Sequence, residues 1–190
     1  MAFSLRAHWK KRFDRWMAER IPPRRKVTLD RRIIYILPTS NGFMFITACG
    51  LVFIAAINYA VSLAFGLAFL MVSIFILATL YSFNNLNRLN LTGQFSPSVF
   101  CGEEACFKVL LSRSAKRKHE ALELNFPDSN ITHVDLVDQD QEKVNVFSHA
   151  AHRGYFKAPL LRVTTYSPFG LCRAWSLVDL DLHCLVYPRP

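Results

Sequence analysis

The sequence predicts three parts in order: an amphipathic N-terminal helix, a membrane hairpin of two transmembrane α-helices, and an all-β antiparallel sandwich. Three observations lead to this fold class. No Asp, Glu, Lys or Arg occurs in the 55 residues from Ile33 to Asn87. Eleven of the 23 Lys and Arg residues lie in residues 1–32. After residue 86, short stretches alternate apolar and polar side chains with period two, which is typical of strands. The expected domains are therefore residues 1–32, 33–85 and 86–190.

The composition supports a membrane protein. Of 190 residues, 52% are hydrophobic and only 19% are charged, which excludes a disordered chain. A soluble domain of this size has no core wide enough to bury so long an uncharged run, whereas the hydrocarbon layer of a bilayer can accommodate it. Of the net charge of +9, residues 1–32 carry +8, from eleven basic and three acidic residues. Because the remainder is nearly neutral, we expect no nucleic-acid partner.

The N-terminal arm, residues 2–20, has the pattern of a helix lying at the membrane surface. Large apolar side chains recur at intervals of four, four and three residues, which places them on one stripe: Leu5, Trp9, Phe13 and Trp16. Basic side chains fill much of the other face, among them Lys10, Lys11 and Arg15. Such a helix suits the headgroup layer of an anionic leaflet, so anionic membrane lipids are an expected partner. The alternative is a helix packed on the protein's own soluble domain.

Two spans are expected within the uncharged run, at residues 42–57 and 60–81, with a tight turn at Asn58 and Tyr59. Pro38 and the candidate caps at residues 39–41 mark the start of the first span. Small residues in the second span are expected to pack on the first: Ala60, Ala64 and Ala68 at four-residue spacing, with Gly66 beside them. A seam between two protomers is the alternative. The basic flank predicts that the N-terminus, and after two crossings the C-terminus, are cytoplasmic.

The last hundred residues predict seven or eight short strands and a domain that folds when residues 1–85 are removed. Alternation is clear at residues 107–111, 122–126, 144–146, 161–165 and 182–186. Turn-forming clusters separate these stretches, and the acidic run at residues 135–142 is expected to be a solvated hairpin end.

Catalytic and metal-binding motifs do not emerge from the sequence. A zinc site from Cys101, Cys106, Cys172 and Cys184 lacks the close paired spacing of known zinc modules, so buried reduced thiols are the favoured interpretation. No nucleophile elbow, Gly-rich phosphate loop or zincin helix occurs. We therefore expect a protein that is not an enzyme and needs no cofactor or metal.

Several stretches together resemble bacterial membrane proteins of the domain-of-unknown-function 58 family. They are residues 37–42 (LPTSNG), 56–59 (AINY), 62–65 (SLAF), 100–103 (FCGE), 153–154 (RG), 167–175 (SPFGLCRAW) and 185–190 (LVYPRP). The resemblance covers nearly everything after residue 33. It does not extend to the C-terminal module that follows the closing strand in that family.

The resemblance implies an inner-membrane protein that acts with a MoxR-type AAA+ ATPase and von Willebrand A-domain proteins in the assembly or maturation of other proteins. It carries over no catalytic residues. We expect a membrane-anchored scaffold or interaction protein presenting a cytoplasmic β-sandwich. The alternative is a small membrane subunit or sensor whose helix pair dimerises or contacts a transporter.

Turn residues and aromatic side chains complete the expected sites. Gly102 is expected in a turn that leads into a strand, and Arg153 with Gly154 in a tight hairpin or bulge where glycine allows a positive φ. Pro168 and Gly170 are expected to flank Phe169 in a turn. Phe169 and Trp175 should plug one end of the sandwich, with a partner-binding surface as the alternative.

Overall fold

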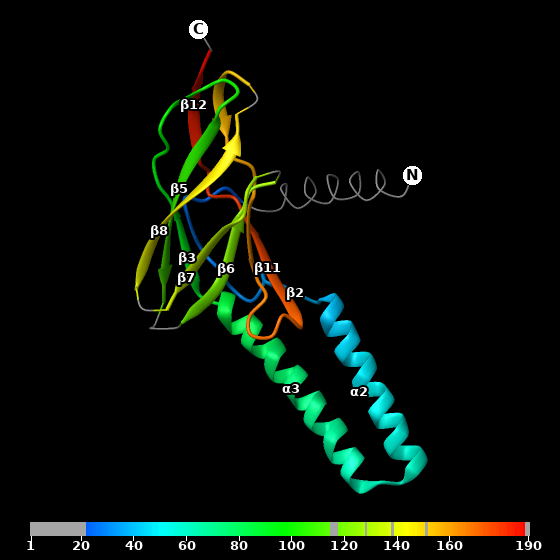
Figure 1. Cartoon of the computed structure of the whole chain (residues 1–190). Helices are drawn as coiled ribbons and strands as arrows, with labels where there is room; N and C mark the ends of the chain where they lie inside the picture. The colour runs from blue at the N-terminus through cyan, green and yellow to red at the C-terminus, as the bar shows by residue number, and fades with distance from the viewer. Residues whose placement is uncertain (1–21, 115–117, 128, 138, 151, 189–190) are drawn as a thin grey trace, which may run out of the picture.

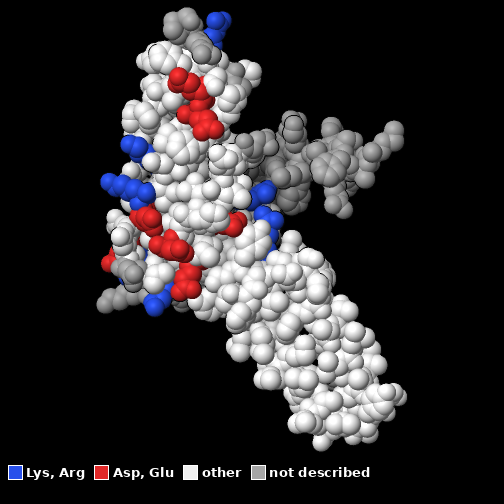
Figure 2. Space-filling view, in the orientation of Figure 1, with Lys and Arg blue, Asp and Glu red and all other residues white. Residues whose placement is uncertain are grey.

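The computed structural model describes residues 22–114, 118–127, 129–137, 139–150 and 152–188. Two long helices lie side by side and project from one end of a domain built of strands (Figure 1). We call the helices the helix hairpin and the strands the β domain. In the space-filling view, acidic and basic side chains lie over the β domain, whereas the helix hairpin is uniformly uncharged (Figure 2).

The helix hairpin consists of α2 (Ser40–Tyr59) and α3 (Ser62–Leu86). Both helices are long and apolar enough to cross a membrane, and only 11% of each apolar window is buried. The turn between them lies at residues 60–61, two residues later than predicted. Ala60 adopts the left-handed conformation (φ 52°) and ends α2, because a residue in that conformation cannot continue a right-handed helix. Asn58 and Tyr59 are therefore helical and do not form the turn.

The β domain contains three sheets. The first sheet has the order β1 (Lys26–Thr28), β3 (Leu89–Gly93), β5 (Glu104–Arg113) and β8 (Gln141–His149). The second has the order β2 (Tyr35–Pro38), β11 (Cys172–Val178), β10 (Leu161–Thr165), β6 (His119–Asn125) and β7 (Thr132–Leu136). A small third sheet, β4 (Val99–Phe100), β12 (His183–Tyr187) and β9 (Gly154–Lys157), includes the end of the domain farthest from the helices (Figure 1).

The strands differ from the prediction in number and direction. Ten strands follow residue 86 in the described chain, where seven or eight were expected. The pairing is antiparallel in both large sheets, but β12 pairs with β4 in parallel (Val186 opposite Val99). The two residues of β4 are too short a segment to show the alternation that reveals a strand in a sequence.

One hydrophobic core joins the two large sheets. Phe107 of the first sheet and Phe126, which follows the β6 strand of the second, meet edge to face with ring centroids 5.6 Å apart, and both are buried. The core also holds Leu29 and Ile34, which precede the helix hairpin in the sequence. These two residues lie beside β1 and β2, so the β domain is assembled from both sides of the hairpin.

The helix hairpin is thus an insertion in the β domain, which was not expected from the sequence. β1 pairs with β3, and β2 pairs with β11 with Tyr35 opposite Trp175. The predicted boundary at residue 86 leaves out these first two strands. β2 escaped prediction because its four residues lie within the uncharged run, all of which was assigned to the membrane hairpin.

Candidate functional site

The candidate functional site is the junction between the helix hairpin and the β domain. We define the junction as the two helix ends together with residues 166–171, the loop between β10 and β11. A single residue, Thr39, separates β2 from α2, and only Asn87 and Arg88 separate α3 from β3. Links this short fix the direction of the helices relative to the sheets.

The first turn of α2 is attached to the loop. The Thr39 backbone N–H donates a hydrogen bond to the Leu171 carbonyl (2.9 Å), and the Thr39 hydroxyl donates to the Gly170 carbonyl (2.5 Å). The same hydroxyl oxygen caps the helix by accepting from the Gly42 backbone N–H (3.1 Å). A Cβ atom on Gly42 would lie 2.1 Å from the Leu171 carbonyl oxygen. Only glycine therefore permits this close approach.

The last turn of α3 is attached to β6 and β10 through Asn85. Its side-chain amide donates to the Glu120 carbonyl (2.7 Å) and to the Thr165 hydroxyl (2.8 Å), and it accepts from the Glu120 backbone N–H (2.8 Å). The Asn85 carbonyl accepts a hydrogen bond from Nδ1 of His119 (2.5 Å). Asn85, His119 and Thr165 are all buried. The asparagine thus binds Glu120 as a neighbouring strand would, through both its N–H and its C=O groups.

Two further side chains of α3 reach the loop and β11. The Ser82 hydroxyl donates to the Ser167 carbonyl (2.6 Å), and the Thr79 hydroxyl lies 3.4 Å from the Cys172 sulfur. Residues 166–171 are therefore held by hydrogen bonds from both helices. This arrangement attaches the loop to both helix ends.

Aromatic and basic side chains cover the outer surface of the junction. We call Tyr35, Tyr166, Phe169 and Trp175 the aromatic belt. Tyr35 and Trp175 stack with ring centroids 5.0 Å apart. The guanidinium carbon of Arg162 lies 5.8 Å from the Trp175 ring, and that of Arg173 lies 5.8 Å from the Tyr166 ring. Such cation–π pairs place positive charge directly beside the belt.

Phe169 and Trp175 do not plug an end of the two large sheets, as the sequence had suggested. Phe169 is 67% exposed at the tip of the loop. Along β11, Ala174 and Ser176 face the core, so Trp175 between them points to the outer face of the sheet. The two-residue period of a strand decides this orientation, and it could not be read from the sequence without the register of β11.

The predicted turn residues occupy turns, bends or strand ends. Gly102 (φ 93°) and Gly170 (φ 66°) adopt positive φ in turns, and Gly154 (φ 106°) does so at the first residue of β9. Pro168 precedes Phe169 in the β10–β11 loop, and Arg153 is exposed beside β9.

The predicted helix-packing residues are divided between two environments. Ala68 is buried, with its carbonyl 3.7 Å from the Cys49 sulfur of α2, and Ala64 is half-buried. Ala60 lies in the turn and is exposed, so it belongs to neither helix face. Gly66 also points away from α2, because a Cβ there would meet no atom within 4 Å. The expected membrane-surface residues, Trp9 to Trp16, lie outside the described residues.

Titratable side chains do not gather into a reactive group in the part of the chain that the structure describes. No three His, Cys, Asp or Glu side chains lie close enough there to hold a metal ion. The cysteines form no disulfide, and Cys172 and Cys184 are buried. Burial raises the pKa of the Cys184 thiol, which keeps it protonated and unreactive. The arrangement of the junction supports attachment and orientation.

The sequence analysis missed the residues that hold the junction together. Ser82 and Asn85 stand at the end of an apolar helix, where polar side chains need partners if they are buried. That position was the available signal, but their partners on β6 and β10 could not be identified without the tertiary structure.

Comparison of the chain with family models, with curated proteins and with solved structures gives no match. The resemblance to the domain-of-unknown-function 58 family therefore stays a prediction.

Proposed function

We propose that this protein is a membrane-anchored scaffold that holds its β domain in a fixed orientation at the cytoplasmic face of the bacterial inner membrane, where the domain binds other proteins. The observation that carries this proposal is the junction. Both helix ends are hydrogen-bonded to the β domain, and no flexible linker lies between them. A tether needs only a helix and a linker, whereas a rigid junction sets the direction in which a surface is presented.

The dimensions of the hairpin suit a bilayer. At 1.5 Å per residue, the 20 residues of α2 span about 30 Å, the thickness of the hydrocarbon layer. The same length of α3 covers residues 62–81, so the turn from Ser82 onward stands above the hydrocarbon. The aromatic belt then lies at the boundary between hydrocarbon and headgroups, where Tyr and Trp are enriched in membrane proteins.

The orientation of the protein follows from its charges. Eleven basic residues precede the hairpin, whereas the turn at residues 60–61 is uncharged. The positive-inside rule places the β domain and both termini in the cytoplasm.

The end of the β domain away from the hairpin offers a surface for a protein partner. Tyr155 is 87% exposed, and Phe100 and Tyr187 are 45% and 48% exposed with ring centroids 6.3 Å apart. Exposed aromatic side chains that cluster in this way are enriched at protein interfaces. By the family resemblance, the partner is a MoxR-type AAA+ ATPase, with von Willebrand A-domain proteins in the same assembly.

The test is site-specific photo-crosslinking of the full chain in nanodiscs. A photoreactive amino acid at Tyr155 should crosslink to a purified MoxR-type ATPase from the same genome, and the same group at Lys143, on the exposed side of β8, is the control. Crosslinking at Tyr155 but not at Lys143 supports the proposal. Equal yields at both positions, or none at either, contradict it.

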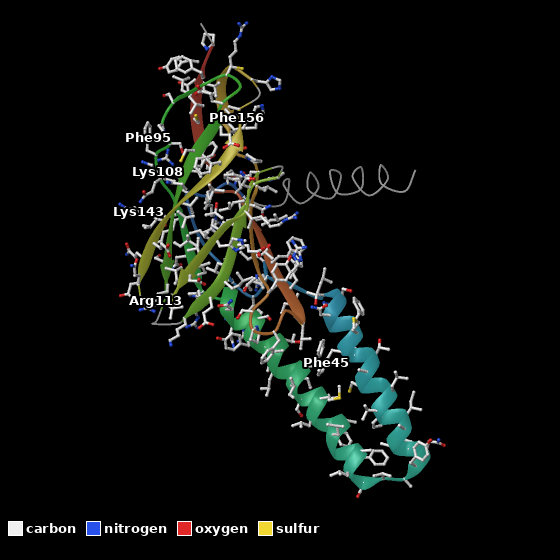
Figure 3. All side chains as sticks on the ribbon, viewed as in Figure 1. Phe45, Phe95, Lys108, Arg113, Lys143 and Phe156 are labelled. Carbon is white, nitrogen blue, oxygen red and sulfur yellow. The ribbon has the colours of Figure 1, made fainter. Side chains whose placement is uncertain are left out.

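A specific observation favours the alternative in which the helix pair itself binds another membrane protein. An apolar hollow of about 280 Å³ lies between the helices, lined by Phe45, Ile46, Cys49, Met71, Val72 and Phe75. Figure 3 shows Phe45 on the side of α2 that faces α3. A side chain from a second helix would fit this hollow. Oxidative crosslinking of two chains through Cys49 in the membrane would support dimerisation, and its absence favours the scaffold.

A further inference from the structure

A polar hollow of about 550 Å³ lies beside the end of α3. It is lined by Asp30, Arg31, Arg32, Asn84, Asn87 and Arg88. One wall is the turn between β1 and β2, and the other is the end of α3 with its link to β3. The Arg88 backbone N–H donates to the Leu29 carbonyl (2.8 Å), and the Leu29 N–H donates to the Leu89 carbonyl (2.9 Å). These bonds hold the two walls together.

The hollow is positively charged and has unused hydrogen-bond donors. Three guanidinium groups accompany one carboxylate, and in the described chain none of the three arginines forms an ion pair. Asn87 also lines the hollow, and its side-chain amide makes no hydrogen bond to any described residue. The Asn87 amide can both donate to and accept from a polar group that enters the hollow.

The C-terminal end of α3 weakens the positive electrostatic potential in the hollow but does not make it negative. The C-terminal end of a helix carries about half a negative charge, which attracts Arg88 and opposes an anion. The three arginines still exceed the carboxylate and this partial charge together. Arg31 is also positioned from the side, because its guanidinium carbon lies 6.0 Å from the Phe83 ring.

The depth of the hollow identifies its ligand, and this step rests on the proposed membrane orientation. If the hydrocarbon ends near Tyr81, Asn84 stands about 4–5 Å above it at 1.5 Å per residue. The headgroup layer of each leaflet is roughly 5–7 Å thick, so the hollow opens where lipid phosphates lie.

We infer that this hollow binds the headgroup of an anionic phospholipid. The arginines bind the phosphodiester, because a guanidinium group can donate two parallel hydrogen bonds to phosphate oxygens. Asn84 and Asn87 can bind hydroxyl groups beyond the phosphate. A zwitterionic lipid brings a cationic group to the same three arginines, so the hollow selects anionic lipids.

Native mass spectrometry of the detergent-solubilised full chain tests this inference. The probes are dioctanoyl phosphatidylglycerol, dioctanoyl phosphatidylcholine and inorganic phosphate. The test variant is R31Q/R88Q. The matched control is K108Q/K143Q, which removes the same charge from the β domain away from the helix hairpin, where Figure 3 shows both lysines. Asn87→Ala removes an amide from the wall of the hollow without changing the charge.

The expected result is one tightly retained phosphatidylglycerol per chain. R31Q/R88Q should bind it about 30-fold more weakly, if each basic residue contributes as basic residues generally do at an anionic surface. Asn87→Ala should weaken phosphatidylglycerol binding less than R31Q/R88Q does. K108Q/K143Q should bind the lipid as tightly as the unsubstituted protein does. Rescue by R31K/R88K should be partial, since lysine cannot donate two parallel hydrogen bonds.

Three results would overturn the inference. They are equal binding of phosphatidylcholine, inorganic phosphate binding as tight as the lipid, and equal losses in R31Q/R88Q and K108Q/K143Q. The scaffold proposal fails separately, in the crosslinking experiment at Tyr155, so the two outcomes can be told apart.

Discussion

The helix hairpin and the β domain use apolar residues in opposite ways. In the hairpin, most large apolar side chains point outward, among them Phe43, Leu63 and Phe69 at 61%, 82% and 61% exposure. In the β domain, Phe107, Leu111 and Leu124 are buried against one another across two sheets. The hairpin is therefore suited to an apolar solvent, whereas the β domain makes its own apolar interior.

Backbone hydrogen bonding separates the two regions as well. A helix satisfies its own N–H and C=O groups and can stand in hydrocarbon, but a strand depends on its neighbours. For that reason the β domain needs β1 and β2 from before the hairpin. The junction joins these two regions with polar side chains that are buried but hydrogen-bonded, chiefly Asn85 and Thr39.

The largest expected effect on stability is the difference between two shortened proteins, one that lacks only the helix hairpin and one that begins at residue 86. Residues 22–190 with 40–81 replaced by a short Gly/Ser linker keep all twelve strands and should fold as a soluble β protein. Residues 86–190 alone lose Leu29 and Ile34 from the core, and β3 and β11 each lose one of their two neighbouring strands. Two lost core side chains correspond to at least about 5 kcal/mol of unfolding free energy.

Urea denaturation followed by circular dichroism measures the difference. The linker version should unfold cooperatively, and residues 86–190 should aggregate or unfold at much lower urea. Equal stability of the two would show that the first two strands contribute little, and that the hairpin is not an insertion in energetic terms.

Asn85→Ala should have the next largest effect. It removes three side-chain hydrogen bonds and leaves the backbone N–H of Glu120 without the partner it has in the structure, so we expect a loss of about 3 kcal/mol. Guanidinium unfolding of the full chain in detergent, followed by tryptophan fluorescence, gives the value. Asn58→Ala, exposed at the end of α2, is the control and should change the free energy of unfolding little. Equal effects of the two would argue against a structural role for Asn85.

Gly42→Ala should cost about 2 kcal/mol, because the new Cβ overlaps the Leu171 carbonyl and forces α2 away from the loop. Gly50→Ala is the matched control, since a Cβ at Gly50 meets nothing within 4 Å and alanine favours the helix. In the same unfolding assay, Gly42→Ala should have a lower free energy of unfolding than the unsubstituted protein. Gly50→Ala should have an equal or higher one. A neutral Gly42→Ala would mean that the contact with Leu171 does not hold the helix in place.

The sequence predicted those features that depend on local pattern. Two long apolar helices follow from the uncharged run, and many strands of the β domain follow from alternation. The position of the turn was missed by two residues, because Asn58 is a polar residue but Ala60 is where the backbone turns.

The features that depend on tertiary pairing could not be predicted. Tyr35 and Ile36 belong to the uncharged run assigned to the membrane hairpin, and only Trp175 and Ala174 opposite them show that they form a strand. Likewise, Asn85 is one polar residue among several at the end of α3, and its role follows only from Glu120 lying beside it.

The most direct test of the account is the side of the membrane on which each region lies. Lys143→Cys places an exposed thiol on the β domain, and Tyr59→Cys places one at the tip of the hairpin, where the tyrosine is 74% exposed. Intact spheroplasts are treated with a membrane-impermeant maleimide, and the unsubstituted protein gives the background from its own cysteines. We predict labelling of Tyr59→Cys from outside, and labelling of Lys143→Cys only after permeabilisation. Labelling of Lys143→Cys in intact spheroplasts would contradict a cytoplasmic β domain.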